Sequence, residues 1–335
     1  MKKYVNLFVF VFMIGACLSQ GRAQTKSAVS YKNPVVDIAM PDPTVIKAAD
    51  GYFYVYATES TRNVPIMKSK DLVEWTYCNT AFTNKTRPRF EPKAGIWAPD
   101  INYINGKYVL YYAMSVWGGE QTCGIGVATA NSPQGPFTDH GKMFRSNEIG
   151  VQNSIDPSLL QYEGRNYLVW GSFRGIYVIE LTADGLSIMS GAKKKRIAGT
   201  AFEAVYIHKH GDYYYMFASI GSCCQGVKST YKVVVGRSKK VWGPYKDKTG
   251  KPMLKNGYSL VIGANDHFVG NGHGSQIIQD DAGQDWLLYH GFLRSTPENG
   301  RILLLDQIKW DQEGWPYVEG GSPSYETQKA PVFNN

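Results

Sequence analysis

Three acidic residues stand at corresponding points of a repeated sequence pattern. Asp42 opens residues 42–46 (DPTVI), Asp156 opens 156–160 (DPSLL) and Glu203 opens 203–207 (EAVYI). Hydrolysis by general acid–base catalysis needs one carboxyl group that keeps its proton and one carboxylate that activates water. Like charges held close together raise one another's pKa, so one member of such a group can remain protonated at neutral pH. The three residues could therefore supply both functions if the fold brings them together.

Each acidic residue taken alone has an ordinary structural explanation. An Asp-Pro pair usually opens a turn, in which the Asp side chain bonds to its own backbone. Glu203 alone could form a structural ion pair, and Asp37, five residues before Asp42, competes with it as a candidate base. The indication of function lies in the equivalent positions that the three residues occupy.

The repeat itself predicts the fold. A short strand with a polar leading residue is followed five times by a turn and an aromatic-rich strand. The aromatic-rich strands are 51–56, 106–112, 164–170, 211–217 and 284–289. A third strand and a fourth segment around an aromatic residue follow, the latter at Trp75, Phe137, Tyr245 and Tyr317.

Four short strands per repeat are typical of a propeller blade. We predict an all-β chain that forms a five-bladed β-propeller. A β-sandwich is the alternative, but it gives no reason for a polar residue at the same strand of every repeat. The first strands of the blades line the central channel, so Asp42, the segment Trp97–Asp100, Asp156, Glu203 and His273 should converge there.

Composition agrees with a single catalytic domain over residues 24–335. The chain has 23 tyrosines and 35 glycines among 335 residues, and its apolar runs are short and interrupted. Its formal charge of +8 includes Lys2, Lys3 and Arg22, and is +5 without residues 1–23. The basic run 193–196 adjoins a turn and is expected to be a solvated loop, so we predict no nucleic-acid partner.

The N-terminus predicts export. Two lysines precede an uncharged apolar run over residues 7–14, as in a secretory signal, and the run is too short to span a bilayer. Two processing sites remain open. A lipoprotein signal would end before Cys17 and leave a lipid anchor there, whereas cleavage after Ala23 would release the chain from Gln24. Either gives a secreted, periplasmic or envelope-anchored protein.

Four cysteines remain after processing: Cys78, Cys123, Cys223 and Cys224. Their spacing does not suggest zinc. The adjacent pair Cys223-Cys224 is left as either a vicinal disulfide or two thiols.

The motifs around the three acidic residues resemble glycoside hydrolase family 43, and within it the endo-acting α-1,5-L-arabinanases. The similar segments are 40–43 (MPDP), 95–100 (GIWAPD), 154–158 (SIDPS), 170–173 (WGSF), 202–207 (FEAVYI) and 221–238. The resemblance covers residues 30 to 320. It implies a five-bladed propeller that inverts the anomeric centre of arabinan, the side-chain polymer of pectin.

The resemblance also implies a role for each residue. Asp42 would be the general base, Glu203 the general acid, and Asp156 the residue that orients the acid and tunes its pKa. His273 matches a histidine presented to a metal, often calcium, at the channel centre, and no organic cofactor is expected. Substrate binding is expected from Trp97, Asp100, Ser172, Phe173 and Tyr206. Asn271, Gly274 and Val205 depart from the common pattern of the family.

Two alternatives accompany this prediction. An exo-acting α-L-arabinofuranosidase or β-xylosidase would use the same fold and carboxylates. A non-catalytic glycan-binding propeller is less favoured, because binding alone does not need a buried cluster of like charges and its desolvation cost.

Overall fold

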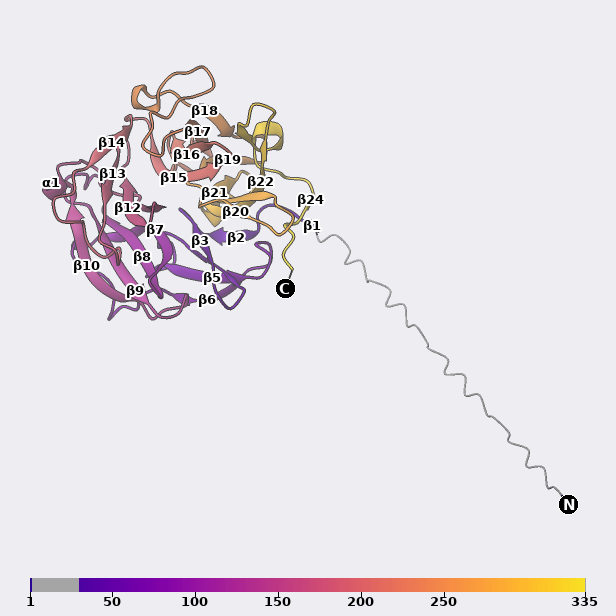
Figure 1. The fold of residues 1–335 in the computed structure, drawn as a ribbon, viewed down its shortest axis with the longest axis horizontal. Coiled ribbons are helices and arrows are strands. Elements are labelled where there is room, and N and C mark those ends of the chain that lie inside the picture. Colours follow the sequence, from indigo (N-terminus) through magenta and orange to yellow (C-terminus); the bar gives the residue numbers. More distant parts are fainter. Residues whose placement is uncertain (2–29, 335) are drawn as a thin grey trace.

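The structure is a computed structural model that describes Met1 and residues 30–334. Five antiparallel sheets follow one another around a ring, and they confirm the predicted five-bladed β-propeller (Figure 1). The signal sequence, Cys17 and Gln24 lie outside the described residues. Among the residues described, no helix is long and apolar enough to cross a membrane.

The first four blades each contain four strands in chain order. Their bounds are β3 (Thr44–Lys47), β4 (Phe53–Tyr56), β5 (Pro65–Ser69) and β6 (Thr76–Thr80); β7 (Gly95–Ile104), β8 (Lys107–Ser115), β9 (Gly124–Ala130) and β10 (Thr138–Arg145); β11 (Ser158–Tyr162), β12 (Arg165–Trp170), β13 (Ile176–Glu180) and β14 (Lys195–Ala198); β15 (Glu203–His210), β16 (Tyr213–Ile220), β17 (Lys232–Ser238) and β18 (Ser259–Ile262). A single turn of helix, α1 (Ser146–Ile149), follows the second blade.

The second strand of each blade is apolar on both faces, because it packs against the neighbouring blades on either side. All four residues of β4 are buried, as are eight of the nine in β8. This burial explains why these strands are rich in tyrosine and phenylalanine, and why strict alternation of polar and apolar residues is missing from them.

The fifth blade closes the ring with strands from both ends of the chain. Its sheet runs β19 (Phe268–Gly272), β21 (Asp285–Leu293), β22 (Ile302–Trp310) and β2 (Val36–Ala39), with β20 (Ile278–Gln279) on β21 and β23 (Pro316–Tyr317) on β22. The repeat predicted only the Tyr317 segment as the outer strand, whereas β2 pairs with the other end of β22. Strands β1 (Ser30–Tyr31) and β24 (Gln328–Lys329) also pair with each other.

A left-handed residue lies in or beside the inner strand of every blade: before β3 and β11, within β7 and β15, and between β19 and β20. The φ angles are positive at Asp42 (54°), Ala98 (42°), Asp156 (57°), Ala204 (54°) and His273 (47°). Such a conformation costs a non-glycine residue about 1–2 kcal/mol, and strained backbone of this kind is concentrated at functional sites. These five left-handed residues are the equivalent positions of the blades. Two residues of the predicted channel lining are offset from them, since Glu203 comes one residue before Ala204 and Asp100 comes two residues after Ala98.

Candidate active site

A cavity of about 840 Å³ opens at the axis of the propeller, and every blade contributes to its wall. Asp42, Asp156 and Glu203 all line it, together with His273. All four residues are buried by their surroundings. The structure therefore brings the three predicted carboxylates into one pocket.

Asp42 is held by residues of the fifth blade. Arg301 Nη1 donates to Asp42 Oδ1 at 2.8 Å, and His273 Nδ1 lies 3.2 Å from the same oxygen. Burial raises the pKa of Asp42, but the positive charges of Arg301 and His273 outweigh it and hold that pKa well below its usual range. Asp42 is therefore a carboxylate at neutral pH.

His290 contacts the backbone of Asp42, and its imidazole is neutral. The backbone N–H of Asp42 donates to His290 Nδ1 at 3.0 Å, so the ring proton is on Nε2. Burial and the nearby charge of Arg301 lower the pKa of His290 well below its usual range. The ring stacks on Tyr231 with centroids 5.6 Å apart, and among the described residues its Nε2 has no hydrogen-bond partner.

Glu203 receives a hydrogen bond on each carboxyl oxygen. Ser172 Oγ donates to Oε2 and Tyr231 OH donates to Oε1, both at 2.5 Å. Asn153 Nδ2 donates to Ser172 Oγ at 2.9 Å and so fixes the serine. A Cβ atom at Gly272 would lie 2.3 Å from Tyr231 Cδ1, so a glycine there lets the tyrosine ring reach Glu203.

The pKa values of Asp156 and Glu203 are raised, whereas that of Asp42 is lowered. Burial raises the pKa of Asp156 to about 8; the charges of Glu203 and Asp42 add to this rise and His273 opposes it. Burial also raises the pKa of Glu203, by more than the hydroxyls of Ser172 and Tyr231 lower it. Asp156 and Glu203 therefore both favour the protonated form, whereas Asp42 favours the ionised form. One pocket thus holds a carboxylate and a proton donor, which is the arrangement that acid–base hydrolysis requires.

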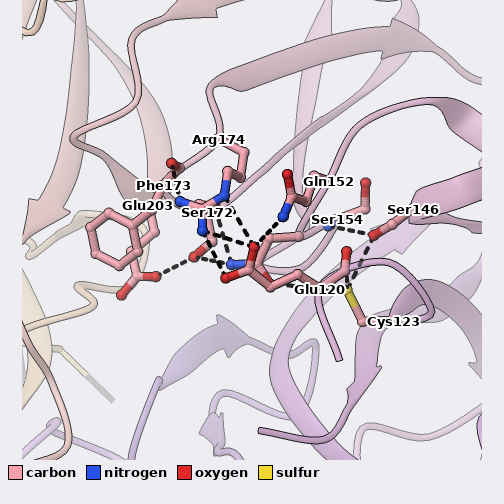
Figure 2. A network of polar contacts seen from close by, with 10 residues as sticks. Glu120, Cys123, Ser146, Gln152, Ser154, Ser172, Phe173, Arg174 and Glu203 are labelled. Atoms are coloured by element: carbon pink, nitrogen blue, oxygen red, sulfur yellow. Dashed lines mark hydrogen bonds and ion pairs between the residues drawn. The ribbon is translucent and has the colours of Figure 1, made fainter. Parts of the chain in front are cut away.

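Two further carboxylates line the pocket but are neutralised by arginines. Glu59 forms a buried ion pair with Arg87, which outweighs burial and lowers the pKa of Glu59. Glu120 accepts hydrogen bonds from Arg174 Nε at 3.0 Å and Nη2 at 2.9 Å, next to the Ser172–Glu203 contact (Figure 2). Each of these two carboxylates is paired with an arginine, so Asp156 and Glu203 are the candidates for the proton donor.

Three of the predicted substrate-binding residues line the cavity: Trp97, Ser172 and Phe173. Trp97 and Phe173 are partly exposed on its wall, and the Trp97 ring packs against Trp117 with centroids 5.5 Å apart. Trp117 is 79% exposed, and the repeat pattern did not single it out. Exposed aromatic rings at the rim of a polar pocket suit the apolar face of a sugar.

Ser172, which was also predicted to bind substrate, forms hydrogen bonds within the site. Its side chain is buried, and its hydroxyl proton is donated to Glu203. Ser172 is therefore a positioning residue for Glu203.

Asp100 and Tyr206, also predicted to bind substrate, do not line the pocket. Tyr206 OH donates to Asp100 Oδ1 at 2.6 Å, and the Leu159 backbone N–H donates to Asp100 Oδ2 at 2.7 Å. These bonds join the second, third and fourth blades inside the channel. Both residues come two positions after the left-handed residue of their blade, and the structure places them outside the pocket wall.

The rival base Asp37 is exposed on β2 and is not part of the pocket wall. The vicinal pair Cys223–Cys224 is bonded as a disulfide and does line the pocket, whereas Cys78 and Cys123 are free.

The residues around His273 fit poorly with a calcium site built by the protein. Calcium prefers six to eight oxygen ligands, and His273 offers one imidazole nitrogen besides the Nδ1 that faces Asp42. Within the described part of the chain, the His, Cys, Asp or Glu side chains that could share one ion gather elsewhere. Calcium at the axis stays a prediction, and no catalytic step below depends on it.

The repeat pattern did not indicate Arg301, His290 or Asn153. Arg301 directly precedes β22 and His290 lies within β21, and the pattern treated both strands only as scaffold. Tyr231 lies within a segment that carried the family resemblance, but nothing in its spacing indicated a contact with Glu203.

The fold and the pocket define a propeller with the acid–base equipment of a glycosidase. Residues 31–316 match the family model for glycosyl hydrolases family 43. The chain belongs to this family and is a glycosidase.

Two curated relatives are similar to the chain at equal identity. The extracellular exo-α-(1→5)-L-arabinofuranosidase ArbA of Cellvibrio japonicus is 36% identical over 306 residues, which cover 83% of this chain and 86% of the relative. The extracellular endo-α-(1→5)-L-arabinanase 1 of Bacillus subtilis is 36% identical over 289 residues, with 82% and 86% covered.

Solved structures give the same family. The α-L-arabinanase of Cellvibrio cellulosa complexed with arabinohexaose superposes with a TM-score of 0.77 at 34% identity, covering 86% of this chain and 98% of that one. The endo-arabinanase of Bacillus licheniformis has a TM-score of 0.73 at 31% identity, with 86% and 99% covered.

Proposed function

We propose that this chain hydrolyses α-1,5-linked L-arabinofuranose chains, cutting them internally and inverting the anomeric centre. The observation that carries the proposal is the opposite protonation of Asp42 and the Asp156–Glu203 pair within one pocket. The similarity to enzymes named as acting on α-1,5-arabinan supports this choice of substrate.

In the proposed reaction Asp42 accepts a proton from water. Arg301 and His273 keep Asp42 ionised and hold its carboxylate in place, so the base needs no prior deprotonation. The water attacks the anomeric carbon as the bond to the departing oxygen breaks. Inversion in a single displacement needs carboxyl groups about 6.5–9.5 Å apart, which leaves room for that water.

Glu203 supplies the proton to the departing oxygen. Ser172 and Tyr231 fix the plane of its carboxyl group, and burial raises the pKa of Glu203 and so favours its protonated form. Asp156 is held by the backbone N–H of Ala204, which donates to Oδ2 at 3.1 Å. We assign Asp156 as a positioning residue that acts through Glu203.

The volume of the pocket supports internal cleavage. Its volume of about 840 Å³ lies towards the upper end of the range for small-molecule sites, about 300–1,000 Å³. Such a site can hold several linked sugars. The exo-acting alternative is kept because a relative named as an exo-acting arabinofuranosidase is equally similar.

The test of catalysis is the Asp42→Asn variant on linear arabinan. We expect hydrolysis to fall by about 10³-fold, in line with the loss of a general base, while arabinan binding persists. Wild-type hydrolysis by this variant would contradict the assignment. Hydrolysis by the wild type separates an enzyme from a glycan-binding propeller, because such a propeller would bind arabinan without hydrolysing it.

The product profile of the wild type tests the mode of cleavage. Short arabino-oligosaccharides should appear first and release from p-nitrophenyl xyloside should be negligible. Free arabinose as the sole early product would establish the exo-acting alternative.

We further propose that the protein acts outside the cytoplasm. The signal-like N-terminus and the extracellular designation of both curated relatives support this. The lipid anchor on Cys17 stays a prediction, which mass spectrometry of the mature N-terminus would test.

A further inference from the structure

A second group of potential ligands lies at the opposite end of the inner strand that begins with Glu203. His208 and His210 stand near the end of β15, and Asp285 begins β21 in the next blade. Glu203 and His210 are seven residues apart along β15, which at the rise of a strand is roughly 20 Å. The cluster is therefore separate from the carboxylate pocket, and it connects β15 of the fourth blade to β21 of the fifth, two strands labelled in Figure 1.

The three side chains present their ligand atoms to a common point. One nitrogen of each imidazole and one oxygen of Asp285 all lie within 4.8 Å of one another. The two histidines are separated by one residue, so they project from the same face of the strand. Among the residues that the structure describes, no other trio of His, Cys, Asp or Glu converges in this way.

The spacing within the cluster suits ligands of a metal better than a direct hydrogen bond. His210 Nδ1 lies 3.6 Å from Asp285 Oδ2, which is too long for a hydrogen bond. A tetrahedral ion with bonds of about 2.1 Å sets its ligand atoms about 3.4 Å apart. The separation of this pair is close to that value, and the three ligand atoms all lie within 4.8 Å of one another.

Neighbouring groups hold these ligands in orientation. Trp310 Nε1 donates to Asp285 Oδ2 at 2.8 Å, and Gln279 Nε2 donates to Oδ1 at 3.2 Å. The His210 ring stacks on Trp310 with centroids 3.7 Å apart and planes 8° from parallel. Such outer contacts fix the orientation of metal ligands in known sites.

The types of side chain in the cluster favour a transition metal. Two imidazoles and one carboxylate suit zinc and similar late transition metals, whereas calcium and magnesium prefer oxygen ligands alone.

We propose that His208, His210 and Asp285 bind one divalent transition-metal ion, with zinc as the representative, and that this ion links the fourth blade to the fifth. The fourth coordination position is open to solvent, because both histidines are partly exposed. The ion would add a cross-link near the blade that closes the ring.

The test is calorimetric titration of the untagged, metal-stripped protein with Zn²⁺ at pH 7.5. We expect wild type to bind one equivalent, and Co²⁺ in its place to give the visible absorption bands of a tetrahedral site. The double variant His208→Ala/His210→Ala should bind Zn²⁺ at least tenfold more weakly, and Asp285→Asn should weaken binding as well. The control is His140→Ala, which removes an exposed histidine on β10 and should bind as wild type does.

Thermal unfolding supplies a second measurement. Zn²⁺ at 100 times its dissociation constant stabilises a folded protein by about 2.7 kcal/mol, so it should raise the melting temperature of wild type and of His140→Ala but not of the double variant. Absence of Zn²⁺ binding by wild type would overturn the proposal. So would unchanged Zn²⁺ binding by a folded double variant, because the ion would then be held elsewhere. These measurements do not depend on arabinan hydrolysis.

Discussion

Arg301 Nη1 donates to Asp42 Oδ1 across 2.8 Å, and this contact joins the last blade of the ring to the first. Arg301 directly precedes β22 and Asp42 lies two residues before β3. The ionisation of Asp42 therefore depends on closure of the ring. The residue that we assign as the base and the arginine that keeps it charged are 259 residues apart in the chain.

Replacing this arginine should change the pH dependence of hydrolysis. Because the Arg301 charge lowers the pKa of Asp42, Arg301→Met should raise that pKa and move the acidic limb of kcat/KM to higher pH. We expect activity at pH 6 to fall at least tenfold, since loss of a charged partner costs about 1.5–3 kcal/mol. Arg301→Lys, which keeps the charge, is the control. An acidic limb at the wild-type position in Arg301→Met would contradict the role given to the arginine.

Removing the hydroxyls that contact Glu203 should move the alkaline limb of the pH profile of kcat/KM. Ser172 and Tyr231 lower the pKa of Glu203, so Ser172→Ala and Tyr231→Phe should each raise it and move the alkaline limb to higher pH. We expect kcat to fall about tenfold as well, because the acid is less well oriented. Tyr103→Phe, on the exposed side of β7, should leave the profile unchanged. A shift of the alkaline limb to lower pH would contradict this account.

Asp156 should reduce the stability of the protein at alkaline pH. Its pKa of about 8 in the folded state exceeds the value of about 3.9 in an unfolded chain. The folded state therefore binds more protons between about pH 4 and 8, so the contribution of Asp156 to stability declines as pH rises through that window. Asp156→Asn should gain about 1–3 kcal/mol at pH 8 and little at pH 4, while activity falls.

Urea unfolding at the two pH values measures this difference. Asn can still accept the hydrogen bond from Ala204, so the variant should keep the backbone of the site. Equal stability changes at pH 4 and pH 8 would mean that the charge of Asp156 is not the cause.

Trp117 should contribute to the binding of substrate. It is 79% exposed at the pocket and is in contact with Trp97. Trp117→Ala should raise KM for arabinan up to about tenfold with a smaller effect on kcat, as loss of an aromatic contact of about 0.5–1.5 kcal/mol predicts. Tyr77→Ala, an exposed aromatic residue on β6 outside the pocket, serves as the control. No change in KM for Trp117→Ala would exclude a sugar contact there.

The fold could be predicted because each blade repeats a local signal. A short strand, a turn and an aromatic strand recur regardless of loop length, and the same repeat placed Asp42, Asp156 and Glu203 in one channel. Closure of the ring by β2 could not be predicted in this way, since that pairing joins Val36 to Leu303 and depends on tertiary structure alone.

The details of the site depended on two features that the pattern does not contain. The left-handed residue of each blade sets which side chain faces the pocket. Asp100 and Tyr206 come two residues after it and bond to each other outside the pocket wall. Contacts between distant segments, such as Asp42 with His290, leave no periodic signal in the sequence.

The stereochemistry of the first product tests the proposed mechanism most directly. Proton NMR of a short arabino-oligosaccharide during the first turnovers distinguishes the two anomers at the newly formed reducing end. We expect the β anomer to appear first and the α anomer to follow only by mutarotation, because Asp42 activates water in a single displacement. Initial formation of the α anomer would contradict this, since retention requires a covalent intermediate and carboxyl groups only about 5–5.5 Å apart.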